Sequence, residues 1–127
     1  MCEPYVNSYV KLAIQQAESS NLNYRMGAVL KRGNTVIGAG CNRNDHPKLR
    51  RWRSPHLNEH TGLHAEMAAI WGLRWHSLKG TIIYVVRLKA DNSLAMAKPC
   101  LMCQEMLASA GIKKVFYSNE IGKIVRL

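Results

Sequence analysis

Apolar residues recur along the chain with two different periods. A spacing of three to four residues places apolar side chains on one face of a helix. This spacing, with the helix-ending signal of Gly111, predicts three helices, over residues 5–20, 65–75 and 100–110.

Short apolar runs between these segments predict five strands. Two of the runs flank Gly33-Asn34, a pair typical of a hairpin turn. The run at residues 81–88 is almost continuously apolar, as expected for a strand in the interior of a sheet. The predicted strands are residues 26–32, 35–40, 81–88, 114–118 and 123–127.

The order of these elements predicts an α/β fold, because helices that alternate with buried strands form layers around a mixed sheet. The length of 127 residues fits one domain over residues 1–127. Only residues 119–122 separate the last two strands, whereas a parallel crossover needs about a dozen residues or more. We therefore expect an antiparallel final pair. Residues 41–63 and 89–98 are predicted loops, and loops as long as the first are usually functional.

Composition narrows the class of protein. With 18 Lys and Arg against 8 Asp and Glu, the net charge of +10 favours partners that carry phosphate. A hydrophobic content of 47% excludes a disordered chain. No apolar run approaches the roughly 18 residues of a membrane span, and the first residues do not resemble a signal peptide. We therefore expect a cytoplasmic protein without membrane contact, whose four cysteines are reduced thiols or metal ligands.

Two short motifs, H-A-E and P-C-x-x-C, stand at the starts of the second and third predicted helices. They contribute His64, Cys100 and Cys103, one imidazole and two thiols. This is a ligand set for a catalytic Zn²⁺ that keeps its fourth position open. Both sulfurs lie on one side of the first helical turn, where the helix dipole favours thiolate. Glu66 can reach a zinc-bound water without being a ligand.

The paired motifs are the signature of zinc nucleobase deaminases, and through them the chain resembles the cytidine/deoxycytidylate deaminase superfamily. That superfamily also contains tRNA adenosine deaminases and DNA- and RNA-editing deaminases. The resemblance covers nearly the whole chain and implies a three-layer α/β/α domain with a five-stranded mixed sheet. Residues 38–42 (G-A-G-C-N) look like the G-x-G-x-N strand end of the family, and residues 110–115 resemble the segment before its fourth strand.

The resemblance also implies a mechanism. Zn²⁺ on the three ligands activates water for attack on C4 of a cytosine-type ring, while Glu66 moves the protons. Asn42 would hold the sugar, and backbone groups near Ala65 and Cys100 would orient the base. The small members of the family associate, so we expect a homo-oligomer.

Two departures from the family pattern bear on the substrate. Residues 89–98 are inserted where related chains run almost directly from the third strand into P-C-x-x-C. The short final connection is more like free-nucleoside deaminases and some toxin deaminases, whereas the histidine ligand is more like the editing and deoxycytidylate branches. The sequence thus favours a deaminase of free nucleotides or nucleosides, with cytosine or adenine in single-stranded DNA or RNA as the alternative substrate.

Other interpretations of the motifs remain open. Cys100 and Cys103 could form a redox pair, although a redox pair would not explain H-A-E. A structural zinc site would need a fourth protein ligand, and Glu66 would have no use there. The candidates for that ligand are Cys41, His46, His56 and His60.

The predicted loop after the second strand carries a further candidate contact. Trp52 lies among basic residues, with Arg51 directly before it. An aromatic ring can stack on a base while neighbouring cations hold phosphate, so both residues are candidate substrate contacts. The alternative is a charged, solvated face.

Overall fold

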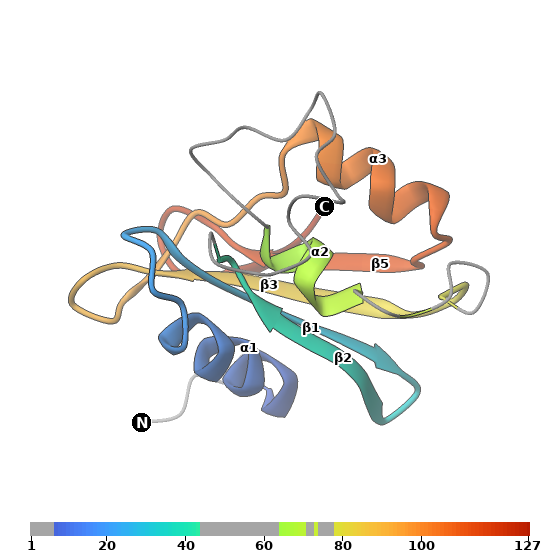
Figure 1. Cartoon of the computed structure of the whole chain (residues 1–127), viewed down its shortest axis with the longest axis horizontal. Helices are drawn as coiled ribbons and strands as arrows, with labels where there is room; N and C mark the ends of the chain where they lie inside the picture. Colours follow the sequence, from blue (N-terminus) through green and yellow to red (C-terminus); the bar gives the residue numbers. More distant parts are fainter. Residues whose placement is uncertain (1–6, 44–63, 71–72, 74–77) are drawn as a thin grey trace.

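The computed structural model of the chain describes residues 7–43, 64–70, 73 and 78–127. In these residues a mixed sheet carries helices on both faces (Figure 1). Helix α1 (Ser8–Glu18) covers one face, and helices α2 (Ala65–Ile70) and α3 (Leu101–Ser109) cover the other. The predicted three-layer α/β/α architecture is confirmed.

The main path of the sheet runs β2–β1–β3–β5–β6. Strand β1 (Arg25–Arg32) pairs antiparallel with β2 (Thr35–Cys41) and with β3 (Ile82–Leu88). Strand β5 (Lys114–Ser118) is parallel to β3, and β6 (Ile124–Arg126) is antiparallel to β5. All five predicted strands are present, and the predicted antiparallel final pair is confirmed.

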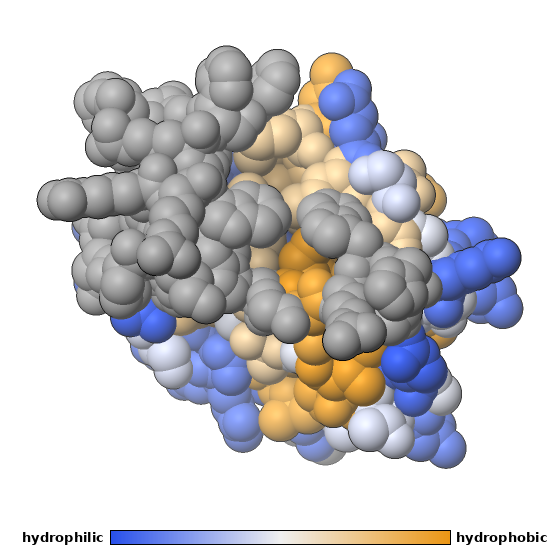
Figure 2. All heavy atoms as spheres, turned by 45° about the vertical axis from the view of Figure 1, so that its right-hand side comes forward, coloured by the Kyte–Doolittle hydropathy of each residue, from blue (hydrophilic) through white to orange (hydrophobic). Residues whose placement is uncertain are grey.

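Alternation along the two central strands builds a core on each face, because successive strand residues point to opposite sides. Val29 of β1 packs toward α1, whereas its neighbours Ala28 and Leu30 pack toward α2 and α3. In β3, Ile83 and Val85 also belong to the core beneath α2 and α3. On the face shown in Figure 2, hydrophobic residues gather toward the centre of the view, and hydrophilic residues lie mostly toward its margins.

The prediction that residues 89–98 form only a loop was wrong. Strand β4 (Leu94–Ala95) pairs antiparallel with the end of β3, so the sheet has six strands instead of five. A tight turn makes this return possible: Asn92 has a positive φ of 67°, and its N–H donates to Lys89 O. Arg25 closes the turn by donating from Nη2 to Lys89 O and to Asn92 Oδ1.

Helix α2 is shorter than predicted. The expected range was residues 65–75, but the helix ends at Ile70. Beyond it, Leu73 N donates to Ile70 O, a bond across three residues that does not continue an α-helix. Residues 71–72 and 74–77 lie outside the described part of the chain, as do residues 44–63 of the predicted long loop.

Two glycines let α2 lie directly on β2. A Cβ on Gly38 would collide with the carbonyl oxygen of Ala69, and a Cβ on Gly40 would lie 2.5 Å from Ala68 Cβ. The earlier glycine of β2 meets the later alanine of α2, and the later glycine meets the earlier alanine, so α2 runs antiparallel to β2. The end of β2 that leads to Asn42 therefore lies toward the start of α2.

No helix in the described residues is long and apolar enough to cross a membrane.

We predict that Gly40→Ala destabilises the protein by about 1–3 kcal/mol, the usual range for overpacking a close contact. The added methyl would also press on Ala69 N, which lies 2.9 Å away, and so displace the first turns of α2. Thermal or urea unfolding measures the effect. The matched control is Ala39→Ser at the exposed neighbouring position, which should unfold like the parent protein; equal stability of both variants would contradict this packing.

Candidate active site and metal centre

The motif residues His64 and Cys100 occupy equivalent positions at the starts of α2 and α3. His64 O accepts from Ala68 N at 2.9 Å, and Cys100 O accepts from Gln104 N at 2.9 Å. Each backbone carbonyl thus receives the first bond of its helix. Cys100 is the N-cap of α3, and its thiol makes no capping hydrogen bond. Cys103 lies one turn further on and is fully buried.

The three side chains converge from two helices that are distant in sequence. His64 Nδ1 lies 3.2 Å from Cys103 Sγ and 3.7 Å from Cys100 Sγ. The ligand atoms of all three residues lie within 4.8 Å of one another. Tetrahedral zinc with ordinary Zn–N and Zn–S bonds separates nitrogen from sulfur by about 3.6 Å. The cluster therefore has the spacing of a zinc site, with Nδ1 as the histidine donor.

Ionisation within the cluster also favours a cation. Burial lowers the pKa of His64, so its imidazole is neutral and can donate a lone pair to a metal. Burial raises the pKa of the Cys103 thiol, and the nearby carboxylate of Glu66 and thiol of Cys100 raise it further. The buried Cys103 thiol and Glu66 carboxyl therefore resist ionisation unless a positive charge joins them.

Glu66 is buried in the first turn of α2, with 2% of its surface exposed. Burial raises the pKa of its carboxyl above the ordinary value, and hydrogen bonds from its own backbone and from Cys103 oppose the shift only in part. The carboxyl therefore lies against the cluster and is more basic than a solvated glutamate. Both properties suit a group that exchanges protons near neutral pH.

Two residues that the sequence analysis did not single out position the segment before α3. Gln104 Nε2 donates to Pro99 O at 2.8 Å and braces the turn that carries Cys100. Ser118, fully buried at the end of β5, donates its hydroxyl to Ala95 O at 2.6 Å. Its carbonyl accepts from Ala97 N at 2.8 Å. A single serine or glutamine carries no sequence signal for such a role.

Asn42 follows β2 and is 7% exposed. Its Oδ1 accepts from Ser20 Oγ at 2.7 Å and from Met26 N at 2.9 Å, and its Nδ2 donates to Tyr24 O. The carboxamide therefore fixes the segment between α1 and β1. One N–H of the side chain has no partner among these bonds and can serve a ligand.

Of the three remaining candidate substrate contacts, only one lies in the described part of the chain. Ala65 is fully buried in the core beneath α2 and α3, directly between His64 and Glu66. Arg51 and Trp52 lie outside the described residues.

Comparison with known families supports the chemistry of this site. The family described as "Cytidine and deoxycytidylate deaminase zinc-binding region" matches residues 4–119, most of the chain. The chain belongs to this family. It is accordingly a zinc-dependent deaminase, and the cluster of His64, Cys100 and Cys103 is where its residues could hold the metal.

Solved structures show the same fold at low identity. The dCMP deaminase from the cyanophage S-TIM5 aligns with a TM-score of 0.66 and 24% identity over 94% of this chain and 86% of its own. A cytidine deaminase from Burkholderia pseudomallei aligns with a TM-score of 0.66 and 19% identity over 94% and 89%. RibD from Acinetobacter baumannii aligns with a TM-score of 0.54 and 24% identity over 86% of this deaminase but only 26% of RibD. No curated protein matches the sequence.

We predict that the purified deaminase contains about one zinc ion per chain, because one cluster among the described residues has the ligands and spacing for it. Cys103→Ser should weaken zinc binding by more than the roughly 10–100-fold that loss of a supporting residue costs. It should also lower the unfolding temperature, because the metal joins α2 to α3. Metal analysis and thermal unfolding measure both effects.

The matched control is Cys41→Ala, which removes a buried thiol outside the cluster. It should keep its zinc. Loss of zinc in this control, or full zinc in Cys103→Ser, would contradict the ligand assignment.

Proposed function

We propose that this deaminase hydrolyses the exocyclic amine of a cytosine-type base in a free nucleotide or nucleoside, forming uracil and ammonia. The convergence of three zinc ligands with one buried carboxyl, Glu66, carries the proposal. The likeness to the cyanophage dCMP deaminase, whose structure is also known with dCMP and dUMP, supports this substrate class.

Glu66 is the residue that moves protons in the proposed reaction. Zinc, when bound, would lower the pKa of a water molecule, so that a hydroxide nucleophile is available near neutral pH. The raised pKa of Glu66 suits it to take a proton from the attacking water. It then delivers one proton to the ring nitrogen as the C4–O bond forms, and a second to the amine, which leaves as ammonia when the C4–N bond breaks.

Other residues are proposed to hold the substrate. The second N–H of the Asn42 side chain can donate a hydrogen bond to a sugar oxygen. Because this group is a donor, its partner on the ligand must be an acceptor atom. Backbone groups around Ala65 and Cys100 would orient the base beside Glu66. Arg51 and Trp52 remain proposed substrate contacts from the sequence, as do the homo-oligomer and the cytoplasmic location.

A second candidate function is deamination of cytosine or adenine in single-stranded DNA or RNA. The net charge of +10 favours this alternative, because nucleic acids attract basic surfaces. Ammonia release from dCMP, cytidine, a cytosine-containing and an adenine-containing oligonucleotide separates the candidates. We expect turnover of the free cytosine compounds; turnover confined to oligonucleotides would favour the alternative.

We predict that Glu66→Gln lowers turnover by at least about 10²–10⁴-fold, because the amide cannot exchange protons. Zinc content should stay near that of the parent, since Glu66 is outside the ligand cluster. Ammonia release and metal analysis on the same preparation measure both.

The matched control is Glu105→Gln on the exposed side of α3, which should keep full activity. Loss of zinc in Glu66→Gln would show that Glu66 is a metal ligand. Full activity in Glu66→Gln would assign the proton transfer to another residue. Either result would contradict the mechanism.

A further inference from the structure

Arg87 lies near the end of β3 on the face that carries the metal centre. Its neighbour Val85, two residues earlier, belongs to the core beneath α2 and α3, so strand alternation directs Arg87 to the same face. Across the sheet it pairs with Met26 of β1 and with Ala95 of β4. Met26 packs against the core that contains Ala65 of the H-A-E motif. Arg87 is thus a cation placed close to the proposed substrate contacts.

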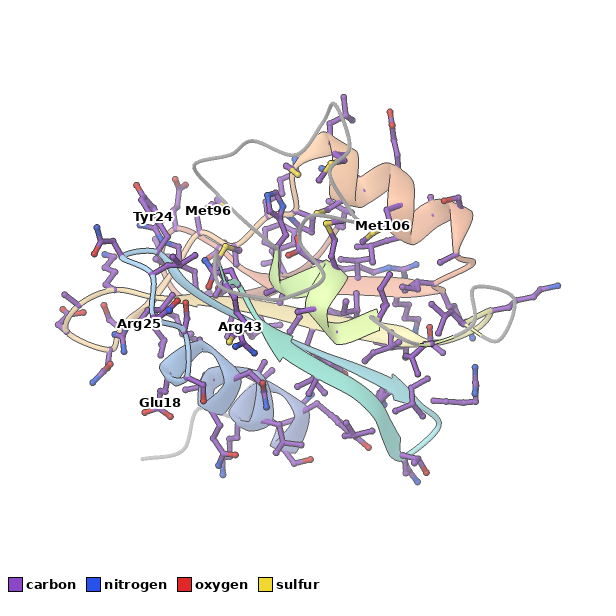
Figure 3. The ribbon with its side chains drawn as sticks, viewed as in Figure 1. Glu18, Tyr24, Arg25, Arg43, Met96 and Met106 are labelled. Carbon is purple, nitrogen blue, oxygen red and sulfur yellow. The ribbon has the colours of Figure 1, made fainter. Side chains whose placement is uncertain are left out.

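The guanidinium of Arg87 stacks on an aromatic ring. Its Cζ lies 3.9 Å from the centroid of the Tyr24 ring. Asn42 Nδ2 donates to the backbone carbonyl of Tyr24, so the proposed sugar contact also fixes the residue that carries the ring. Tyr24 and Met96 lie at the end of the sheet where β1 begins (Figure 3). Stacking fixes the plane of the guanidinium and leaves its in-plane N–H groups available.

The guanidinium of Arg87 makes no hydrogen bond within the described residues, although the backbone N–H of Arg87 donates to Ser118 Oγ. Its Nε is buried without a hydrogen-bond partner, and no described carboxylate forms an ion pair with it. Arg25 at the same end of the sheet differs, because its Nη2 donates to Lys89 O and Asn92 Oδ1. A buried donor without an acceptor is costly, and a cation without a counter-charge favours an anionic ligand.

We propose that Arg87 binds the 5′-phosphate of the substrate nucleotide, with the ring of Tyr24 holding the guanidinium in place. This inference rests on the proposed function and narrows its substrate from nucleosides to nucleotides. The base would lie beside Glu66, the sugar against Asn42, and the phosphate against Arg87 beyond them. A guanidinium suits this role because its fork of N–H groups matches the oxygens of a phosphate.

The test compares the binding of dUMP and deoxyuridine to the zinc-loaded protein, because neither product is turned over. We expect the parent to bind dUMP more tightly than deoxyuridine. Arg87→Met, which keeps an unbranched apolar stem, should weaken dUMP binding by about 10–100-fold, the scale of a hydrogen bond to a charged group, and leave deoxyuridine binding unchanged. The matched control is Arg32→Met at the opposite, exposed end of β1, which removes the same charge and should change neither affinity.

Several results would overturn the inference. These are equal affinity of the parent for both products, equal weakening of both in Arg87→Met, or an Arg87-dependent affinity confined to oligonucleotides. If Arg87→Met does not fold, the NMR resonance of the Arg87 Nε–Hε group in the parent protein tests the proposal instead. It should shift with dUMP and not with deoxyuridine, and an unchanged resonance with dUMP contradicts the proposal.

The outcomes separate this inference from the proposed function. A protein that deaminates free cytosine compounds without any dependence on Arg87 contradicts the inference alone. A protein that deaminates none of them, but shows the Arg87-dependent preference for dUMP, contradicts the proposed function and supports the phosphate site.

Discussion

The site depends on the close approach of α2 to the backbone of β2. Gly38 and Gly40 allow the helix to lie directly on the strand, at a distance that no side chain would permit. This contact determines where α2 begins, and therefore where His64 and Glu66 lie relative to α3. The three residues that could hold zinc are then brought together by the layering of the fold, because two helix starts meet on one face of the sheet.

The same arrangement governs the electrostatics of the site. The first turn of α2 carries Glu66 inward, where burial raises the pKa of its carboxyl. The neighbouring thiol of Cys103 has a raised pKa for the same reason. Groups that resist ionisation in each other's company accept a shared cation readily. The chemistry of the deaminase family and the packing of this chain therefore point to the same metal centre.

Local sequence patterns predicted the elements and the ligand set, since periodicity and C-x-x-C spacing are properties of neighbouring residues. Strand β4 escaped prediction because two residues carry no pattern, and its position depends on the left-handed turn at Asn92 and on Ser118 from a distant strand. The hydrogen bonds of Asn42 were equally hidden, because its partners lie between the end of α1 and the start of β1, 16 to 22 residues earlier in the chain. In the sequence Arg87 is one polar residue in an apolar strand, and no local pattern encodes its stacking on Tyr24.

X-ray absorption at the zinc edge tests the central claim most directly, because it reports the atoms bound to the metal. Two sulfurs at about 2.3 Å and two lighter atoms at about 2.0–2.1 Å are expected for His64, Cys100, Cys103 and one open position. The outer-shell scattering should be that of a single imidazole. Three or more sulfurs, a second imidazole, or a shell without sulfur would contradict the account.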